Sequence, residues 1–395
     1  MMNIKNNILN QNIELCCGCG ACSNICPKNT IKLELKHGFY YPVIDEQKCI
    51  ECGLCMASCQ INNYNIIQKN AFKPYLIKVM NDSRMQSSSG GAAYAIEKEF
   101  LRKNFSSAVC GVMMDDNLHV KHCLTKSEDL LECFQGSKYV QSNKGDLYNK
   151  IASVLSNGEK VLFTGTSCEC EAVYLFLNSK HIPIDNLYTI AILCHGVASP
   201  YVFEKYISEL ERKNKSRVKK FLFRDKNISW RNDSFHVVFE NEKHLSRDHF
   251  LSSYRELYID RSLNIRNSCN SCRYNYSNYV SDIVMGDFWG IERDYYDYDD
   301  KKGVSIVLTG SKKGDEMIEY IKDYSTIVEI SGCTYLQPQM LMPTKKNQKK
   351  DIFFKMIEEK NGYIKAAKQY TDYGWVNRVL HKFMRELNKI EGKRL

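Results

Sequence analysis

Two short cysteine runs near the N-terminus constrain this chain more than any other feature. The first has the spacing C-x2-C-x2-C-x3-C-P, and the second repeats that spacing but ends in Gln60 where the first has proline. In such paired runs, three closely spaced thiolates hold one [4Fe–4S] cube and the fourth reaches the neighbouring cube. The spacing therefore predicts two crossed ligand sets: Cys16, Cys19, Cys22 and Cys59 for one cluster, and Cys49, Cys52, Cys55 and Cys26 for the other.

A pair of zinc knots is the alternative interpretation of these cysteines. Zinc takes four ligands in two C-x2-C pairs, whereas two four-cysteine runs with this repeat are typical of dicluster ferredoxins. Between the runs, residues 31–43 predict two short strands around His37-Gly38. We expect a compact ferredoxin module over residues 1–66, with Cys17 as a bystander beside Cys16.

Length and composition exclude a small disulfide-stapled fold and a disordered protein. The chain has 395 residues, 44% hydrophobic and 26% charged, which is enough for two or three packed units. Of its 18 cysteines, nine fall between Cys16 and Cys59, a density that indicates metal ligation in a reducing compartment. No apolar run approaches the roughly 18 residues of a membrane span, and no export signal is recognisable. We therefore expect a cytoplasmic location.

The net charge of +9 is concentrated at the C-terminal end. Residues 341–395 carry 14 Lys and Arg against 6 Asp and Glu. Such a basic segment could bind an acidic protein, an anionic glycan or a membrane surface. The alternative is a solvated amphipathic helix without a binding role. Phe353, Phe354 and Ile357 fall at helical spacing, which favours packing onto the rest of the protein. No nucleic-acid-binding motif accompanies the charge, so we expect no nucleic-acid partner.

After a polar linker over residues 62–73, strands and helices alternate. Strands are predicted at 108–114, 118–124, 161–164, 187–194 and 304–308, and helices at 92–104, 146–156, 168–178, 200–213 and 313–324. This order predicts a mixed sheet with helices.

Residues 87–91 combine serine hydroxyls, glycine backbone and the start of a predicted helix. This combination suits an anion such as a pyrophosphate, although an ordinary serine-capped helix start is the simpler explanation. The loop 164–167 has a similar composition and suits phosphate or cluster contacts.

Four later cysteines fall at predicted strand ends or in loops, where ligands converge: Cys168, Cys194, Cys269 and Cys272. They could complete a third cubane or a four-cysteine zinc site, and their spacing does not decide between the two. Cys170 is a possible substitute ligand.

Several short motifs follow one another in a fixed order. They are Ser88–Gly91, Gly136–Ser142, Phe163–Cys168, Cys194–Gly196, Cys269–Cys272, Ser281–Ile283, Gly286–Gly290 and Lys302–Ser305. Over residues 75–345 this ordered set resembles the beta subunit family of coenzyme F420-dependent hydrogenases and dehydrogenases. Ser167 departs from the family, which usually has proline before the cysteine, and leaves the geometry of that loop open.

The resemblance implies a flavoprotein with FAD beside a third [4Fe–4S] cluster on Cys168, Cys194, Cys269 and Cys272. The residues implied to line the flavin are Ser88, Ser89, Gly90, Gly91, Gly136, Ser137, Lys138 and Tyr139, with Asp287 and Trp289 close to it. Lys138 is the candidate catalytic residue, because its charge could stabilise reduced, anionic flavin; a solvent-facing lysine is the alternative. Residues 223–226 and 230–232 resemble a substrate-side segment.

These features predict an α+β protein in three parts. A bacterial-type dicluster ferredoxin fold (1–66) is followed by a mixed α/β flavin-binding domain (75–340) and a basic helical tail (341–395). We expect an iron–sulfur flavoprotein oxidoreductase that exchanges electrons with a protein such as ferredoxin, in a direction that the sequence does not set. Similar bacterial proteins are associated with polysaccharide biosynthesis, so a sugar or glycan precursor is the expected substrate, with a deazaflavin coenzyme as a further candidate. A non-catalytic electron-transfer subunit and a zinc-structured scaffold are the alternatives.

Overall fold

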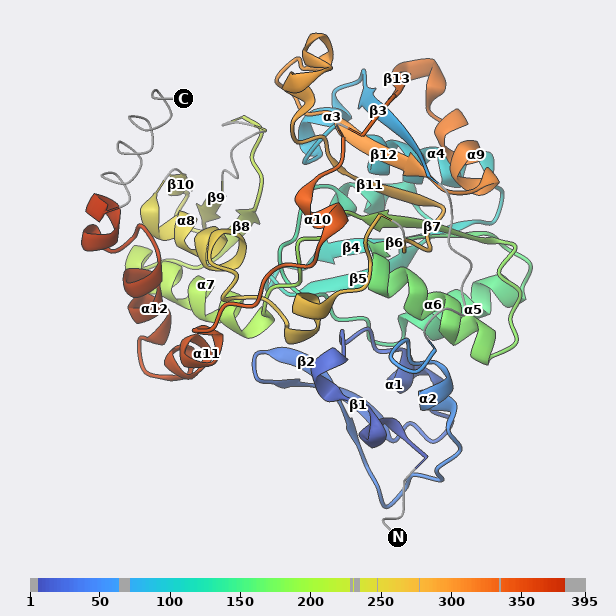
Figure 1. Ribbon diagram of the computed structural model, residues 1–395, viewed down its shortest axis with the longest axis horizontal. Helices are drawn as coiled ribbons and strands as arrows, with labels where there is room; N and C mark the ends of the chain where they lie inside the picture. Colours follow the sequence, from blue (N-terminus) through green and yellow to red (C-terminus); the bar gives the residue numbers. More distant parts are fainter. Residues whose placement is uncertain are drawn as a thin grey trace.

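The computed structural model describes residues 6–63, 72–227, 230, 235–246, 248–276, 278–333 and 335–380. Figure 1 shows three parts: an N-terminal module, a large mixed sheet with helices, and a helical region around a small sheet. This arrangement confirms the predicted α+β class. Within the described ranges, no helix combines the length and the hydropathy that crossing a bilayer requires.

The N-terminal module consists of two short helices and one hairpin. Helices α1 (Ala21–Ile25) and α2 (Leu54–Ala57) flank the antiparallel strands β1 (Ile31–Lys36) and β2 (Phe39–Ile44). The hairpin turns at His37 and Gly38, whose φ angles are 49° and 81°. Helix α1 packs against α5 (Leu147–Ser156) and α6 (Ser167–Ser179), so the module lies against the main sheet (Figure 1).

The main sheet has eight strands in the order β13-β3-β12-β11-β7-β6-β4-β5. Their bounds are β3 Lys73–Val79, β4 Ala108–Met114, β5 Val120–Thr125, β6 Val161–Thr166, β7 Leu187–Ile192, β11 Ile283–Asp287, β12 Ser305–Thr309 and β13 Ser325–Glu329. The central strands β4, β6, β7 and β11 are parallel, and the strands on either side are added antiparallel. The carboxyl ends of the parallel strands therefore share one edge of the sheet, where ligands bind in open α/β sheets.

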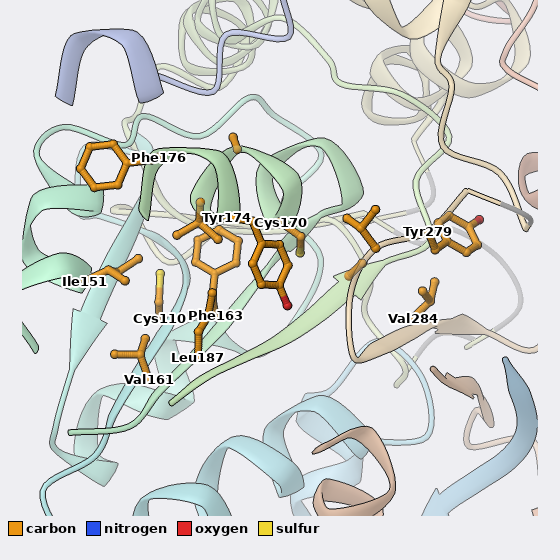
Figure 2. Packing of buried hydrophobic residues seen from close by; sticks show 14 of the residues in the cluster. Cys110, Ile151, Val161, Phe163, Cys170, Tyr174, Phe176, Leu187, Tyr279 and Val284 are labelled. Carbon is orange, nitrogen blue, oxygen red and sulfur yellow. The ribbon is translucent and has the colours of Figure 1, made fainter. Parts of the chain in front are cut away.

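Helices cover both faces of this sheet. Along β6, Val161 and Phe163 pack with α5 and α6, while Leu162 packs on the opposite side with α4 (Ala92–Lys103) and α9 (Lys312–Glu319). Figure 2 shows the first of these layers, in which Phe163 lies near Tyr174 and Cys170 of α6. Because both faces are buried, the central strands are almost continuously apolar.

The third part is a separate core rich in aromatic side chains. Helices α7 (Pro200–Asn214) and α8 (His249–Arg255) lie with the antiparallel strands β8 (Val218–Leu222), β9 (His236–Phe239) and β10 (His244–Ser246). Tyr206 of α7 stacks on Tyr254 of α8 with ring centroids 5.2 Å apart.

Part of the basic C-terminal segment belongs to this same core. The buried residues of helices α11 (Lys350–Glu358) and α12 (Gly362–Tyr370) include Phe353, Ile357 and Tyr363. The part of the tail formed by α11 and α12, residues 350–370, is therefore packed onto the protein, whereas Trp375, Val379 and Leu380 are exposed. The rest of the predicted tail, 381–395, lies outside the described residues.

The remaining short elements are α3 (Ser83–Gln86), α10 (Pro338–Leu341), a π-helical turn Glu256–Asp260, and 3-10 turns at Ile8–Asn10, Ile13–Leu15, Glu128–Phe134, Asn267–Ser271, Ile291–Arg293, Tyr296–Tyr298 and Lys322–Tyr324.

Candidate functional site

The eight cysteines of the N-terminal runs surround two cavities. One is lined by Cys26, Cys49, Cys52 and Cys55. The other is lined by Cys16, Cys19, Cys22 and Cys59, together with Cys17. The structure thus brings together the two crossed sets that the spacing predicts.

Glycines in left-handed conformations position these cysteines. Gly20 (φ 86°) and Gly53 (φ 76°) precede α1 and α2, which carry Cys22 and Cys55. At Gly18 (φ 70°) an added Cβ would lie 2.4 Å from the side-chain nitrogen of Gln141 and 2.6 Å from the carbonyl oxygen of Tyr40. A side chain at position 18 would therefore push the module away from the loop that carries Gln141.

The four later cysteines lie together beside the module. Cys168 is the second residue of α6, which directly follows β6, and Cys194 follows β7, so two neighbouring parallel strands bring them to one sheet edge. Cys269 lies in the 3-10 turn Asn267–Ser271, and Cys272 follows that turn. Burial raises the pKa of Cys194, and the charges of Cys269, Cys168 and Cys272 raise it further. A Cβ added at Gly196, two residues beyond Cys194, would lie 3.5 Å from Cβ of Cys269. Cys170 instead points into the core, where its thiol contacts the carbonyl oxygen of Ile190 at 3.7 Å.

Cys17 connects the two groups of cysteines. Its thiol interacts with that of Cys168, and this interaction raises the pKa of Cys168. The Cys17 thiol also accepts a hydrogen bond from the side chain of Gln60 at 2.5 Å. Gln60 also accepts a hydrogen bond from the hydroxyl of Tyr274, and its carbonyl oxygen accepts one from Arg273 at 2.9 Å. The residue that replaces proline in the second run is thus part of the junction between the module and the sheet.

The serine-glycine loop lies between α3 and α4 and contacts several distant segments. The hydroxyl of Ser88 bonds that of Ser137 at 2.8 Å, and the hydroxyl of Ser89 donates to the carbonyl oxygen of Val304 at 2.7 Å. At Gly90 an added Cβ would lie 2.3 Å from the carbonyl oxygen of Ile77. Gly91 has φ 87° and begins α4. The loop is held rigidly, and only glycine fits its centre.

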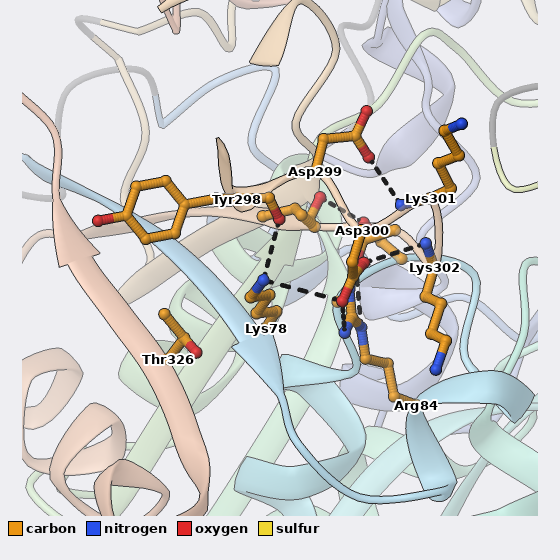
Figure 3. Close-up of polar contacts among 12 residues, drawn as sticks. Lys78, Arg84, Tyr298, Asp299, Asp300, Lys301, Lys302 and Thr326 are labelled. Carbon is orange, nitrogen blue, oxygen red and sulfur yellow. Dashed lines mark hydrogen bonds and ion pairs between the residues drawn. The ribbon is translucent and has the colours of Figure 1, made fainter. Parts of the chain in front are cut away.

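Two cationic side chains reinforce this loop. Arg84, which is buried, makes a two-pronged ion pair with Asp300 at 2.7 and 2.6 Å and donates from Nε to the carbonyl oxygen of Gly303 at 3.0 Å (Figure 3). Lys226 donates to the carbonyl oxygens of Arg84, at 2.7 Å, and of Ser89. Burial and the neighbouring Arg84 lower the pKa of Lys226 to about 7.

The predicted contacts at the end of β11 lie beside the same loop. Arg224 pairs with Asp287 at 2.7 Å and donates to the carbonyl oxygen of Ser88 at 3.4 Å. Trp289 stacks on Trp230 with ring centroids 5.6 Å apart and an interplanar angle of 11°. Arg224 falls within the segment 223–226, but its position beside Ser88 and Asp287 depends on the tertiary structure and has no local sequence signal. Of the predicted substrate-side segment, Arg231 and Asn232 lie outside the described residues.

Lys138 has a different environment from its predicted neighbours. Its ammonium group donates to three carbonyl oxygens at the end of the 3-10 turn Glu128–Phe134, those of Cys133, Phe134 and Gln135, at 2.7–3.0 Å. Burial lowers its pKa to about 8. In this conformation Lys138 closes a helical turn, and its ammonium group is occupied by these three carbonyl oxygens.

Comparisons with known proteins identify two regions of the chain. Residues 15–63 match the family described as 4Fe-4S dicluster domain, and residues 158–331 match the family described as the C terminus of the beta subunit of coenzyme F420 hydrogenase/dehydrogenase. The chain is similar to these two families over the matched residues. It is therefore an iron–sulfur protein of the oxidoreductase and electron-transfer class. The beta subunit match includes Cys168, Cys194, Cys269, Cys272, Asp287 and Trp289 but not the serine-glycine loop.

A solved structure and the curated proteins complete the comparison. A chain of the F420-reducing [NiFe] hydrogenase complex from Methanosarcina barkeri, studied by xenon derivatization, is 16% identical in sequence with a TM-score of 0.47. The alignment covers 77% of this chain and 91% of that chain. No curated protein matches the sequence.

The environments of the two N-terminal cysteine sets fit iron–sulfur clusters. Burial raises the pKa of Cys22 and Cys55, and raises that of Cys59 to about 11. Several such thiols at one place cannot all ionise without a compensating cation, which is what iron supplies. Among the residues that the structure describes, no group of three or more His, Cys, Asp or Glu side chains is arranged to hold a single metal ion.

The surroundings of the serine-glycine loop fit a phosphate-bearing cofactor. Helix α4 starts at Gly91 without a side-chain cap, so its N-terminal amides are available to an anion. Three cationic groups lie beside this loop: Lys226, and Arg84 and Arg224, which are each paired with an aspartate. The stacked pair Trp230 and Trp289 adds a flat aromatic surface next to Arg224. Anion-binding and stacking groups together suit a dinucleotide such as FAD.

Proposed function

We propose that this protein is an FAD- and [4Fe–4S]-dependent oxidoreductase that passes electrons between a partner protein and a small substrate. The observation that carries the proposal is the convergence of Cys168, Cys194 and Asp287 at the carboxyl ends of β6, β7 and β11. The third cysteine set and the serine-glycine loop therefore meet at one edge of the sheet.

Tyr258 connects these two places directly. Its hydroxyl donates to the carbonyl oxygen of Gly196, two residues beyond Cys194, at 2.7 Å. Its ring packs against Tyr139, with centroids 5.7 Å apart, and the hydroxyl of Tyr139 accepts a hydrogen bond from Arg224 at 3.4 Å. The proposed third cluster and the proposed flavin would thus be separated by a short, packed aromatic path.

In this proposal each set of residues has its own role. Cys16, Cys19, Cys22 and Cys59 hold one cluster, Cys49, Cys52, Cys55 and Cys26 a second, and Cys168, Cys194, Cys269 and Cys272 a third. The serine-glycine loop, with Arg84 and Lys226, binds the pyrophosphate of FAD. When bound, FAD exchanges single electrons with clusters and electron pairs with an organic substrate. Cys52 is exposed beside Ile50, which is 57% exposed, so a partner protein would approach the second cluster there.

The substrate class rests on similarity alone. A sugar or glycan precursor is favoured by the similarity to polysaccharide-associated bacterial proteins, and a deazaflavin coenzyme by the match to the beta subunit family. Anaerobic assays that follow flavin oxidation on addition of each substrate would separate the two.

The central experiment is a count of iron, zinc and flavin per chain after anaerobic purification. About twelve irons and one FAD are expected for three clusters and a flavin. The Cys269→Ser variant should lose about four irons, whereas Cys110→Ser, a core cysteine, should lose none. Zinc in place of the missing iron, or no change in Cys269→Ser, would refute the third cluster.

A further measurement distinguishes an enzyme from an electron-transfer subunit. Reduced protein should be reoxidised by small organic acceptors through an accessible flavin. Reoxidation only by an added partner protein would favour the electron-transfer subunit.

A further inference from the structure

Arg266 is a fully buried cation whose side chain finds no carboxylate partner among the described residues. Its exposed fraction is 0%. Nε donates to the carbonyl oxygen of Cys16 at 2.6 Å and Nη1 donates to the side chain of Gln141 at 3.3 Å, while Nη2 is buried with no hydrogen-bond partner. Glu14 is nearby but exposed, and its carboxylate accepts a hydrogen bond from Asn267 at 2.7 Å.

The backbone of Arg266 holds the guanidinium at the junction between the module and the sheet. Its amide donates to the carbonyl oxygen of Val197 at 2.9 Å, and its carbonyl oxygen accepts from the amide of Cys269 at 3.1 Å. The guanidinium lies 4.0 Å from the ring centroid of Tyr41 in the module. Arg266 therefore lies beside Cys16 of the first cysteine set and Cys269 of the third.

A buried charge is costly unless another charge compensates it. This requirement is met by an ion pair at each of three other arginines: Arg84 with Asp300, Arg224 with Asp287, and Arg273 with Glu171. For Arg266, the negative charge available nearby would be that of an iron–sulfur cluster bound by several cysteine thiolates. A neighbouring positive charge stabilises the more negative, reduced state of such a cluster, because net charge sets cluster potentials.

We propose that Arg266 is the counter-cation of the iron–sulfur sites at this junction, and that its charge raises the reduction potential of the cluster on Cys16, Cys19, Cys22 and Cys59. The inference rests on the proposed ligand sets but not on the flavin. Arg266 is a positioning residue, because among the described residues its guanidinium donates to a carbonyl oxygen and an amide oxygen rather than to a cysteine sulfur. Its charge would make the cluster held by Cys16, Cys19, Cys22 and Cys59 easier to reduce by one electron than the cluster held by Cys49, Cys52, Cys55 and Cys26, and no bond would form or break in that reduction.

The test is a redox titration of the iron-loaded protein, followed by electron paramagnetic resonance. Arg266→Met should lower the equilibrium constant for one-electron reduction of the cluster on Cys16, Cys19, Cys22 and Cys59 by about tenfold or more. This corresponds to a fall in its reduction potential of about 59 mV. Arg266→Lys keeps the charge and should retain most of the original potential. The cluster on Cys49, Cys52, Cys55 and Cys26 is an internal control and should not shift; its signal is assigned with Cys52→Ser.

Equal shifts in the Met and Lys variants, equal shifts of both clusters, or no shift in Arg266→Met would overturn the proposal. If Arg266→Met loses iron, Gln141→Glu provides the decisive variant, because it places a negative charge against an intact guanidinium and should also lower the potential. An unchanged potential in Gln141→Glu would then refute the role of the charge. Purified protein without flavin would refute the proposed enzyme but leave this test intact, whereas protein without iron would refute both.

Discussion

The thiols of Cys17 and Cys168 interact with each other across the boundary between the N-terminal module and the main sheet, and the neighbouring Cys17 raises the pKa of Cys168. Cys17 lines the cavity of the first cysteine set, and Cys168 belongs to the third. A single sulfur contact therefore joins two sites that the sequence places in different domains.

The first prediction concerns the role of Cys17. Because the cavity that it lines already has four cysteines, Cys17→Ala should keep the iron content of the wild-type protein, whereas Cys168→Ala should lose about four irons per chain. Iron analysis after anaerobic purification measures both. A loss of iron in Cys17→Ala would show that Cys17 is itself a ligand.

The second prediction concerns Lys226 and the flavin. Lys226→Met removes a charged donor beside the serine-glycine loop, so the dissociation constant for FAD should rise about tenfold or more. Fluorescence titration of deflavinated protein measures this, with the exposed Lys220→Met as the matched control. Because the pKa of Lys226 is lowered to about 7, its ammonium form is lost above that pH. FAD affinity should therefore fall between pH 6 and pH 8 in the wild-type protein but not in Lys226→Met.

The third prediction concerns a buried ion pair near the junction. Lys144, which is 4% exposed, pairs with Glu169 and also donates to the hydroxyl of Ser142 at 3.0 Å. Burial would raise the pKa of Glu169, but Lys144 and the other groups facing it lower that pKa to about 2. Lys144→Met should lower the free energy of unfolding by about 3–5 kcal/mol, because a buried carboxylate is left without its counter-charge.

Anaerobic thermal denaturation tests this prediction. The double variant Lys144→Met/Glu169→Gln should be more stable than the single variant. Lys150→Met, which breaks an exposed pair with Asp146, should cost less than about 1 kcal/mol. Equal stability of the single and double variants would contradict the assignment.

The fourth prediction concerns the pH dependence that Glu97 confers. Burial raises its pKa to about 7, although the hydroxyl of Thr164 donates to it at 2.8 Å. Below about pH 4.5 the folded and unfolded states are both protonated. Between pH 4.5 and 7 the unfolded state releases the proton and the folded state keeps it, so the free energy of unfolding falls as pH rises.

Glu97→Gln should remove this dependence. Its melting temperature should match that of the wild-type protein near pH 4.5 and exceed it at pH 8, where the wild-type penalty is on the order of 3 kcal/mol. The exposed Glu132→Gln should show no such pH-dependent gain. A constant difference at all pH values would point to packing rather than ionisation.

Features with local spacing rules could be predicted from the sequence. The two crossed cysteine sets follow from repeats within eleven residues, and the places of Cys168 and Cys194 follow from strand-then-helix patterns. The roles of Arg266 and Cys17 could not be predicted, because both depend on how the module docks against the sheet. Lys138 shows the same limit: its motif is local, but the carbonyls that bind its ammonium group belong to a turn that the sequence does not reveal.

The position of β3 has a consequence for how the chain is made. This strand follows the module in the sequence, yet its two neighbours in the sheet are β12 and β13, which are synthesised more than two hundred residues later. On the ribosome the module can fold as soon as it emerges, while β3 must wait for nearly the whole chain. The N-terminal cysteines can therefore be brought together well before Cys168, Cys194, Cys269 and Cys272, whose positions depend on the main sheet.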